Sequence, residues 1–243
     1  MTDLKLPVPE RLRRGDGKRR ERRHVERGRD LWLYMARALG LDDLGGQRVL
    51  DMGCGTKFTQ AILEYDLPIG EYAGVDVYAD MIDFLKESVQ DPRFSFAHMN
   101  THNAMYNTDG DLLSAETRLP LPEAHFDLVC LFSVFTHIEP HDYHNMLKVL
   151  RRYVRPEGRV LFSLYLDERT GNGHGLIEQV TADIPDWQPT GKDFYDGIPD
   201  KPLQWAVYSR RHALDLIEGT GWEVEEVCLP NDLVQHHIIC RPV

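Results

Sequence analysis

The sequence predicts a doubly wound α/β fold, in which helices cover both faces of a mostly parallel sheet. Short apolar runs rich in β-branched residues alternate with helical stretches along most of the chain, as expected of right-handed strand–helix–strand units. The run FDLVCLFSVF at 126–135 is apolar almost throughout, which is typical of a central strand covered on both faces. With 243 residues, of which 42% are apolar and 28% charged, the chain suits one globular domain.

The N-terminal part of the chain is predicted to be a basic arm that leads into a helix. Two prolines and two glycines within the first 17 residues disfavour a helix or strand there. Apolar residues recur at helical spacing from about 18 to 39, and Gly40 ends this helix. We therefore divide the chain into an arm with the start of the helix, residues 1–30, and a single domain, residues 31–243.

The elements after this helix follow from short patterns. Four strands are predicted in RVLDMG, YAGVDV, RFSFAHM and FDLVCLFSVF, and a fifth in GRVLFSLYL after the helical segment HDYHNMLKVLRRYV. The chain ends in a helix, SRRHALDLIEGTG, and two strands, WEVEEVCL and QHHIICRP. The stretch 167–203 shows no strong periodicity and is too long for an ordinary connection, so we interpret it as a lid or cap.

Composition and charge exclude several classes of protein. The longest apolar stretch has eight residues, far short of the ~20 that a membrane-spanning helix needs. The N-terminus lacks the apolar core of a secretory signal, so a cytoplasmic protein is expected. The four cysteines form no CxxC pair, which disfavours a disulfide framework and a cysteine zinc site. A net charge of −11 disfavours nucleic acid as the main partner, and we interpret the basic segment 10–29 as a solvated face.

The most specific motif is VLDMGCGTKFTQ at 49–60, which reads as a strand, a glycine turn and a helix. Gly53 and Gly55 let the backbone bend sharply and approach a ligand closely, and the amides of a helix N-terminus follow. Asp76 ends the next strand, 25 residues after Asp51, where a carboxylate can accept both hydroxyls of a ribose. No third glycine completes GxGxxG, which disfavours a dinucleotide. Taken alone, the glycines also suit a tight turn that binds nothing.

These motifs resemble the class I S-adenosylmethionine-dependent methyltransferases. DMGCGT matches their first motif, GVDV the second, LPLPEAHFDLVCLFSVFTHI the region of the fourth strand, and LRRYVRPEGRVLFSLY that of the fifth. The resemblance covers roughly residues 30–240 and implies S-adenosylmethionine as cofactor. It also implies a seven-stranded sheet whose antiparallel last strand is QHHIICRP. A finer resemblance is to actinobacterial sugar O-methyltransferases that build polymethylated polysaccharides.

The resemblance assigns cofactor contacts position by position. The implied cofactor-binding residues are Asp51, Gly53, Cys54, Gly55, Asp76, Val77, Met99, Asn100, Phe132 and Ser133. Within this set, the glycine turn would face the methionine part of the cofactor, Asp51 would organise its ammonium group, and Asp76 would hold the ribose. The pair after the third strand would lie beside the adenine, and the pair after the fourth would border the cofactor. Lys57 and Phe58 depart from the small residues that are usual after GCGT.

Methyl transfer to an alcohol calls for a base, and three histidines follow the fourth predicted strand. The segment THIEPHDYHNM places His137, His141 and His144 at offsets of four and three, on one side of a helix. An imidazole with an ordinary pKa of about 6.5 suits proton acceptance at neutral pH. We predict His144 as the base and His137 as the second choice. The alternatives are surface histidines without a task and a shared zinc ion, and no metal is expected because no carboxylate pattern of metal spacing accompanies them.

Two stretches, about 99–118 and 167–203, are predicted to be insertions on the acceptor side. They combine amide side chains with aromatic rings, which are the groups that bind a polyhydroxylated ring. The predicted acceptor-binding residues are Tyr65, Asn103, His141, Trp187 and Tyr195. The alternative is that the aromatic rings of the second insertion only pack the cap onto the core.

The sequence therefore predicts an S-adenosylmethionine-dependent O-methyltransferase that acts on a hydroxyl of a small polar acceptor, with a sugar or oligosaccharide favoured. Two alternatives stay open: an N-methyltransferase of a small metabolite, and a module that binds the cofactor without catalysis. Neither a membrane nor nucleic acid is expected as a partner. Association of two chains into a homodimer is left open.

Overall fold

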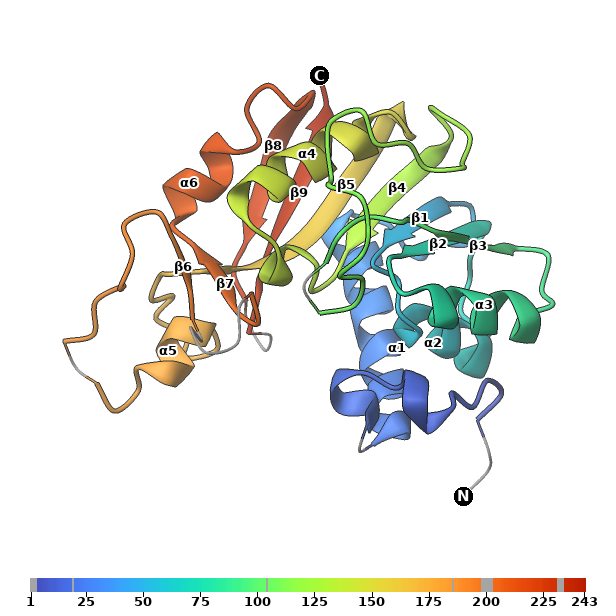
Figure 1. Cartoon of the computed structure of the whole chain (residues 1–243). Helices are drawn as coiled ribbons and strands as arrows, with labels where there is room; N and C mark the ends of the chain where they lie inside the picture. The colour runs from blue at the N-terminus through green and yellow to red at the C-terminus, as the bar shows by residue number, and fades with distance from the viewer. Residues whose placement is uncertain (1–3, 19, 104, 185, 198–202, 231–233) are drawn as a thin grey trace. The chain divides into compact units, whose positions relative to one another are not determined.

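The computed structural model describes residues 4–18, 20–103, 105–184, 186–197, 203–230 and 234–243. The predicted insertions therefore include a few positions outside the described residues, at 104, 185 and 198–202. The chain forms two compact units, Met1–Asn100 and Thr101–Val243 (Figure 1). No helix among the described residues is both long and apolar enough to cross a membrane.

The first unit contains three parallel strands in the order β3-β2-β1. They are β1 (Arg48–Met52), β2 (Glu71–Asp76) and β3 (Phe94–His98), as three of the predicted apolar runs require. Parallel pairing places Met52 opposite Val75 and Asp76 opposite His98. The carboxyl ends of the three strands therefore lie along one edge, which is where open α/β sheets bind ligands.

Three α-helices complete the first unit, and they begin close to where the sequence predicts them. They are α1 (Glu21–Ala38), α2 (Lys57–Tyr65) and α3 (Ala79–Ser88). The ring of Trp32 in α1 lies 5.4 Å from that of Phe58 in α2 and 6.3 Å from that of Tyr72 in β2 (ring centroids). Phe58 is therefore a core residue that joins two helices to the sheet. This packing explains the bulk of Phe58 at a position where the resemblance described above implies a small residue.

The predicted arm packs onto the first unit. Leu6, Val8 and Leu12 are buried. Gln60 of α2 holds this segment, because its Nε2 donates to the carbonyl of Leu6 at 2.9 Å and to Glu21 Oε1 at 3.0 Å. The same Glu21 oxygen accepts from the backbone N–H of Val8 at 2.7 Å. The arm is thus attached to the helix that follows the glycine turn.

The arm also contains regular structure that the sequence does not predict. Two short 3-10 helices, η1 (Glu10–Leu12) and η2 (Gly15–Lys18), precede α1. The expectation of an arm without a helix of its own was therefore wrong for these residues. Such short turns show no periodicity, and three isolated apolar residues among prolines and arginines do not reveal that they are buried.

Helix α1 approaches the first turn of α2 at Gly28. A Cβ atom there would lie 2.7 Å from the carbonyl oxygen of Lys57 and 3.0 Å from Cβ of Ala61. We expect Gly28→Ala to lower the free energy of unfolding by about 1–3 kcal/mol, because the helices would have to move apart, although alanine favours helix. Chemical denaturation measures this, with Gly46→Ala, where an added Cβ meets nothing within 4 Å, as the control. An equal effect of the two variants would contradict the close approach.

The second unit contains a sheet with the strand order β4-β5-β9-β8. The strands are β4 (Phe126–Leu131), β5 (Val154–Leu166), β9 (His236–Pro242) and β8 (Trp222–Cys228). Strand β5 pairs with β4 in parallel and with β9 antiparallel, and β8 pairs antiparallel with β9 (Figure 1). The predicted α/β fold with an antiparallel last strand is confirmed. Strand β5 starts earlier than predicted, because it includes the segment RPEG that precedes the predicted strand. A shift in the register of pairing with β4 accommodates these residues.

Two helices of this unit are joined by a hydrogen bond from a side chain to a backbone carbonyl. They are α4 (Pro140–Arg151), α5 (Leu176–Val180) and α6 (Arg210–Asp215), with a 3-10 helix η3 (Phe135–His137) after β4. The buried hydroxyl of Tyr143 donates to the carbonyl of Ala213 at 3.0 Å, which ties α4 to α6.

Two short strands were not predicted. They are β6 (Phe194–Asp196) within the cap region and β7 (Ala206–Tyr208) just after it. Strand β7 pairs in parallel with the end of β5, where Tyr165 lies opposite Val207, and β6 pairs antiparallel with β7. Strands of three residues are too short to show an alternating pattern. The cap region is therefore attached directly to the carboxyl end of β5.

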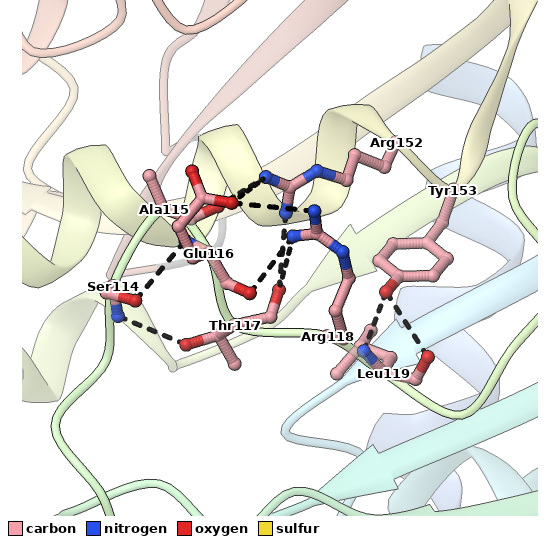
Figure 2. Close-up of polar contacts among 8 residues, drawn as sticks. All are labelled: Ser114, Ala115, Glu116, Thr117, Arg118, Leu119, Arg152 and Tyr153. Carbon is pink, nitrogen blue, oxygen red and sulfur yellow. Dashed lines mark hydrogen bonds and ion pairs between the residues drawn. The ribbon is translucent and has the colours of Figure 1, made fainter.

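Part of the first insertion is anchored at the start of β5 (Figure 2). The guanidinium group of Arg152 donates to the carbonyls of Ala115 at 2.5 Å and Thr117 at 3.2 Å. The Tyr153 hydroxyl accepts from the N–H of Leu119 at 2.6 Å and donates to its carbonyl at 3.2 Å. Because Tyr153 directly precedes β5, this segment lies at the amino end of that strand.

Candidate active site

The turn after β1 has the backbone conformation that the two glycines permit. Gly53 and Gly55 have φ values of +72° and +48°, in the left-handed region that favours glycine. The N–H groups of Gly53 and Cys54 donate to the carbonyl of Val75 at 2.7 and 3.0 Å, which fixes the turn to β2. A Cβ on Gly55 would meet no atom within 4 Å. The backbone at Gly55 is therefore open to close approach from one side.

Asp76 connects the end of β2 to this turn. Its Oδ2 accepts from the N–H of Gly55 at 2.9 Å, and its Oδ1 accepts from the N–H of Tyr78 at 3.0 Å. Burial raises the pKa of the Asp76 carboxyl, and the backbone N–H donors oppose that rise. A carboxylate has about four lone-pair sites, so each oxygen can accept one more hydrogen bond. Asp76 therefore fits a pair of neighbouring hydroxyls while it holds the turn.

Asp51 and Cys54 occupy the core side of the turn. Asp51 is 2% exposed and accepts a hydrogen bond from the Tyr72 hydroxyl at 2.5 Å. The side chain of Cys54 is buried in an apolar cluster with Leu6 and Met81, and burial raises the pKa of its thiol. Cys54 therefore belongs to the turn through its backbone, whereas its thiol is part of the core.

The remaining predicted cofactor residues of the first unit lie at the ends of β2 and β3. The N–H of Met99 donates to the carbonyl of Asp76 at 3.0 Å, and Nε2 of His98 lies 3.1 Å from the carbonyl of Val77. Met99 is buried, and Asn100 is exposed at the end of the unit. The structure thus brings eight of the ten predicted residues, from Asp51 to Asn100, to one edge of the first sheet.

Phe132 and Ser133 follow β4 in the second unit. Ser133 has φ +61°, which turns the chain out of the sheet, so that β4 ends at Leu131 instead of continuing to 135. The Ser133 N–H donates to Oγ of Ser163 at 2.8 Å, and the amide of Gln235 donates to Oγ of Ser133 at 2.9 Å. This left-handed non-glycine residue marks a turn that the surrounding hydrogen bonds hold in place.

The three predicted histidines have different hydrogen-bond partners, and two of them, His141 and His144, share helix α4. His137 lies in η3 with Nδ1 3.0 Å from the carbonyl of Leu203, and His144 lies in α4 with Nδ1 2.8 Å from the carbonyl of Leu216. Nε2 of exposed His141 accepts from the amide of Asn145 at 2.9 Å. Among the described residues, no group of three or more His, Cys, Asp or Glu side chains is arranged to hold a metal ion.

The backbone carbonyls determine which nitrogen of His137 and His144 is basic. A carbonyl oxygen only accepts hydrogen bonds, so Nδ1 of each ring carries the proton and Nε2 carries the lone pair. Burial lowers the pKa of His137, and the carbonyls of Leu203 and Gln204 only partly oppose this. His137 is therefore neutral at pH 7, as a general base must be.

The predicted acceptor residues have different surroundings. Tyr65 is the last residue of α2, with the Arg29 guanidinium 4.9 Å above its ring, and lies ~12 Å along the helix from its start. Oδ1 of Asn103 accepts from two N–H groups of its own turn, at 3.0 and 3.1 Å. Trp187 and Tyr195 are partly buried, and burial together with the charge of Asp167 raises the pKa of Tyr195 to about 12.

A charged cluster at the carboxyl end of β5 was missed by sequence reasoning. Nε of Arg210 donates to Glu168 at 2.8 Å, and Nε2 of His236 lies 2.8 Å from the same carboxylate. Burial alone would raise the pKa of Glu168, but the hydrogen bonds from His236 and Arg210 lower it to about 2. Burial and the charges of Glu168 and Asp193 raise the pKa of Asp167 to about 6. The sequence signal that could have revealed this cluster is the pair of adjacent acidic residues, Asp167 and Glu168, directly after β5.

Comparison with known proteins agrees with this geometry. The methyltransferase domain family matches residues 50–162, which include the glycine turn, Asp76 and the turn after β4. The demethylmenaquinone methyltransferase of Bacillus subtilis (strain 168) is 30% identical over 117 residues, 48% of this chain and 44% of that protein. Over this stretch, just under half of its length, the chain is similar to the S-adenosylmethionine-dependent methyltransferases. It spans less than half the length of this relative.

Solved methyltransferase structures share the fold across most of the chain. The magnesium protoporphyrin IX methyltransferase of Synechocystis PCC 6803, with bound SAH, is 13% identical with a TM-score of 0.54, covering 96% of this chain and 92% of that one. The 1,6-didemethyltoxoflavin-N1-methyltransferase of Burkholderia thailandensis, bound to S-adenosylhomocysteine, is 14% identical with a TM-score of 0.53, covering 90% and 78%. S-adenosylmethionine is the cofactor of this family. The open backbone at Gly55 and the remaining acceptor sites of Asp76 fit such a cofactor.

Proposed function

We propose that this methyltransferase transfers the methyl group of S-adenosylmethionine to an oxygen of a small polar acceptor, with a saccharide as the favoured class. The observation that carries the proposal is the partly buried imidazole of His137, whose proton is held on Nδ1 by a carbonyl 3.0 Å away. A hydroxyl needs a base when it is methylated, whereas an amine acceptor can do without one. A neutral imidazole next to the carboxyl end of β4 suits the hydroxyl.

The chain's own residues have separate tasks in this proposal. When bound, the cofactor supplies a methyl group already activated by its sulfonium charge. The glycine turn and Asp76 hold the ribose end, and Asp51 orients the ammonium end. His137 accepts the proton of the acceptor hydroxyl, with His144 as the second candidate. Since the methyl group is already activated, alignment and proton removal are the chemistry that the protein must provide.

The base is tested by His137→Gln and His144→Ala. We expect His137→Gln to lower turnover by about 100-fold or more, because general base catalysis typically contributes that much. The affinity for S-adenosylhomocysteine should stay unchanged in both variants. His125→Gln, at the amino end of β4, is the control. If turnover persists in both single variants and in the double variant, the acceptor needs no histidine base, as expected of the N-methyltransferase alternative.

The acceptor class rests on the two insertions. The partly buried rings of Trp187 and Tyr195 are suited to cover the apolar face of a sugar. A specific observation favours a second candidate, methylation of an apolar ring such as the demethylmenaquinone of the Bacillus relative. Four apolar side chains of the insertions are exposed, namely Leu112 (84%), Ile184 (51%), Met105 (43%) and Val180 (43%). Exposed apolar groups of this kind commonly mark binding surfaces.

Transfer of a labelled methyl group distinguishes these possibilities. The protein is incubated with methyl-labelled S-adenosylmethionine and panels of sugars, phenols, amines and naphthoquinols, and the labelled products are identified. A methylated sugar or phenol hydroxyl supports the proposal. A ring-methylated naphthoquinol supports the second candidate, and a methylated amine supports the N-methyltransferase alternative. Cofactor binding without transfer to any compound would indicate a binding module.

A further inference from the structure

Lys57 is a charged residue at a position where the family resemblance implies a small one. It is the first residue of α2 and follows the glycine turn directly, with Thr56 as the N-cap. Its side chain is partly buried. A Cβ on Gly28 of α1 would lie 3.0 Å from Cγ of Lys57, so the aliphatic part of the side chain lies against α1. The absence of a side chain at Gly28 makes room for the aliphatic part of Lys57.

The charge of Lys57 is poorly compensated. Burial and the positive charge of Arg27 lower the pKa of the Lys57 ammonium group, and the charge of Asp51 opposes this. Within the part of the chain that the structure describes, the ammonium group of the partly buried Lys57 side chain makes no hydrogen bond or ion pair. Asp51 already accepts a hydrogen bond from Tyr72. Burial, together with the positive charge of Lys57, lowers the pKa of partly buried His24 to about 4. The start of α2 therefore carries excess positive charge.

We propose that Lys57 binds the carboxylate of the methionine part of S-adenosylmethionine. This assignment rests on the proposed function. The methionine part carries an ammonium and a carboxylate group on one carbon, and Asp51 and Lys57 provide the two opposite charges beside the same glycine turn. The N-terminus of α2 adds a favourable field for an anion. Lys57 is thus a binding residue for the cofactor and has no part in the base chemistry.

Three ligands that differ in charge test this assignment by calorimetry. S-adenosylhomocysteine has both the ammonium and the carboxylate, decarboxylated S-adenosylmethionine has the ammonium and a sulfonium but no carboxylate, and 5′-methylthioadenosine has none of these charged groups. The dissociation constant of each is measured for the wild-type protein and for Lys57→Met, which keeps the aliphatic packing against Gly28. Lys86→Met, on the exposed side of α3, is the matched control.

We expect Lys57→Met to weaken the binding of S-adenosylhomocysteine by about 10- to 100-fold, which is the range for the loss of a hydrogen bond to a charged group. Decarboxylated S-adenosylmethionine and 5′-methylthioadenosine should bind Lys57→Met at least as tightly as they bind the wild type. Lys86→Met should change none of the three. The melting temperature of ligand-free Lys57→Met should be equal to or above that of the wild type, because a partly buried charge is removed.

Two results would overturn the assignment while leaving cofactor use intact. One is unchanged affinity of Lys57→Met for S-adenosylhomocysteine. The other is equal weakening of S-adenosylhomocysteine and of the decarboxylated ligand, which would mean that Lys57 acts through Asp51 on the ammonium end. A wild-type protein that binds none of the three ligands would overturn the proposed function and the assignment with it.

Discussion

Asp76→Ala is expected to weaken the binding of S-adenosylhomocysteine by about 100- to 10,000-fold. Two hydrogen bonds from ribose hydroxyls to a carboxylate are worth about 1.5–3 kcal/mol each, and every 1.4 kcal/mol corresponds to about tenfold. The substitution also removes the acceptor of the Gly55 N–H, which donates a hydrogen bond to Asp76 Oδ2 at 2.9 Å. Loss of this anchor loosens the turn that faces the methionine part. Isothermal calorimetry on the folded variant measures the effect.

The control for this experiment is Asp80→Ala. Asp80 is an exposed carboxylate in the first turn of α3, four residues further along the chain. Asp80→Ala should leave the affinity for S-adenosylhomocysteine unchanged. This control separates a general effect of removing a negative charge from the loss of a direct contact with the ligand. Adenine, which has no ribose, should bind wild type and Asp76→Ala with similar affinity. A folded Asp76→Ala that retains wild-type affinity for S-adenosylhomocysteine would contradict the role of Asp76.

The main sheet and the glycine turn were predictable because local patterns encode them. Each main strand is a run of apolar, often β-branched residues, and β9 was assigned its antiparallel place from the family resemblance. Gly53 and Gly55 are visible in the sequence because only glycine adopts their φ values without strain. The carboxylate of Asp76 reaches this turn because parallel strands end at one edge. These features depend on short stretches of sequence.

The missed features depend on contacts between distant residues. Glu168 forms an ion pair with His236. Ser163 forms a hydrogen bond with Gln235, which lies 72 positions further along the chain. No local pattern reveals such partners. The buried arm is a similar case, because Leu6 is covered by Gln60 and its neighbours only after α2 has formed. For His144, the spacing suggested a rim position, and the bond of its Nδ1 to Leu216 became visible only in the fold.

The stability of the protein is expected to fall as the pH is lowered from 7.5 to 5, with His237 a major cause. His237 is 2% exposed, and burial, with the charge of His236, lowers its pKa from 6.5 to about 3. Between these values the unfolded chain binds a proton that the folded protein does not. Each histidine of this kind lowers the free energy of unfolding by ~1.4 kcal/mol for every pH unit below 6.5, which amounts to about 2 kcal/mol at pH 5.

Other groups act in this pH range and set how much of the loss His237 explains. His24, whose pKa is lowered to about 4, acts in the same direction. Asp167 acts in the opposite direction, because its raised pKa of about 6 lets the folded protein bind a proton before the unfolded chain does. Glu168, with a pKa of about 2, stays ionised in both states above pH 4.5 and contributes little. A single histidine variant should therefore reduce the loss without abolishing it.

His237→Phe isolates the contribution of His237. Phenylalanine cannot bind a proton, and it keeps an aromatic ring against Phe132, whose centroid lies 5.6 Å from that of His237. Urea denaturation at pH 7.5 measures any change in packing, because His237 is neutral in both states there. From pH 7.5 to 5 the variant should lose about 2 kcal/mol less than the wild type. An equal loss in the two proteins would mean that His237 gains its proton in the folded state, and that the end of β9 is open to water.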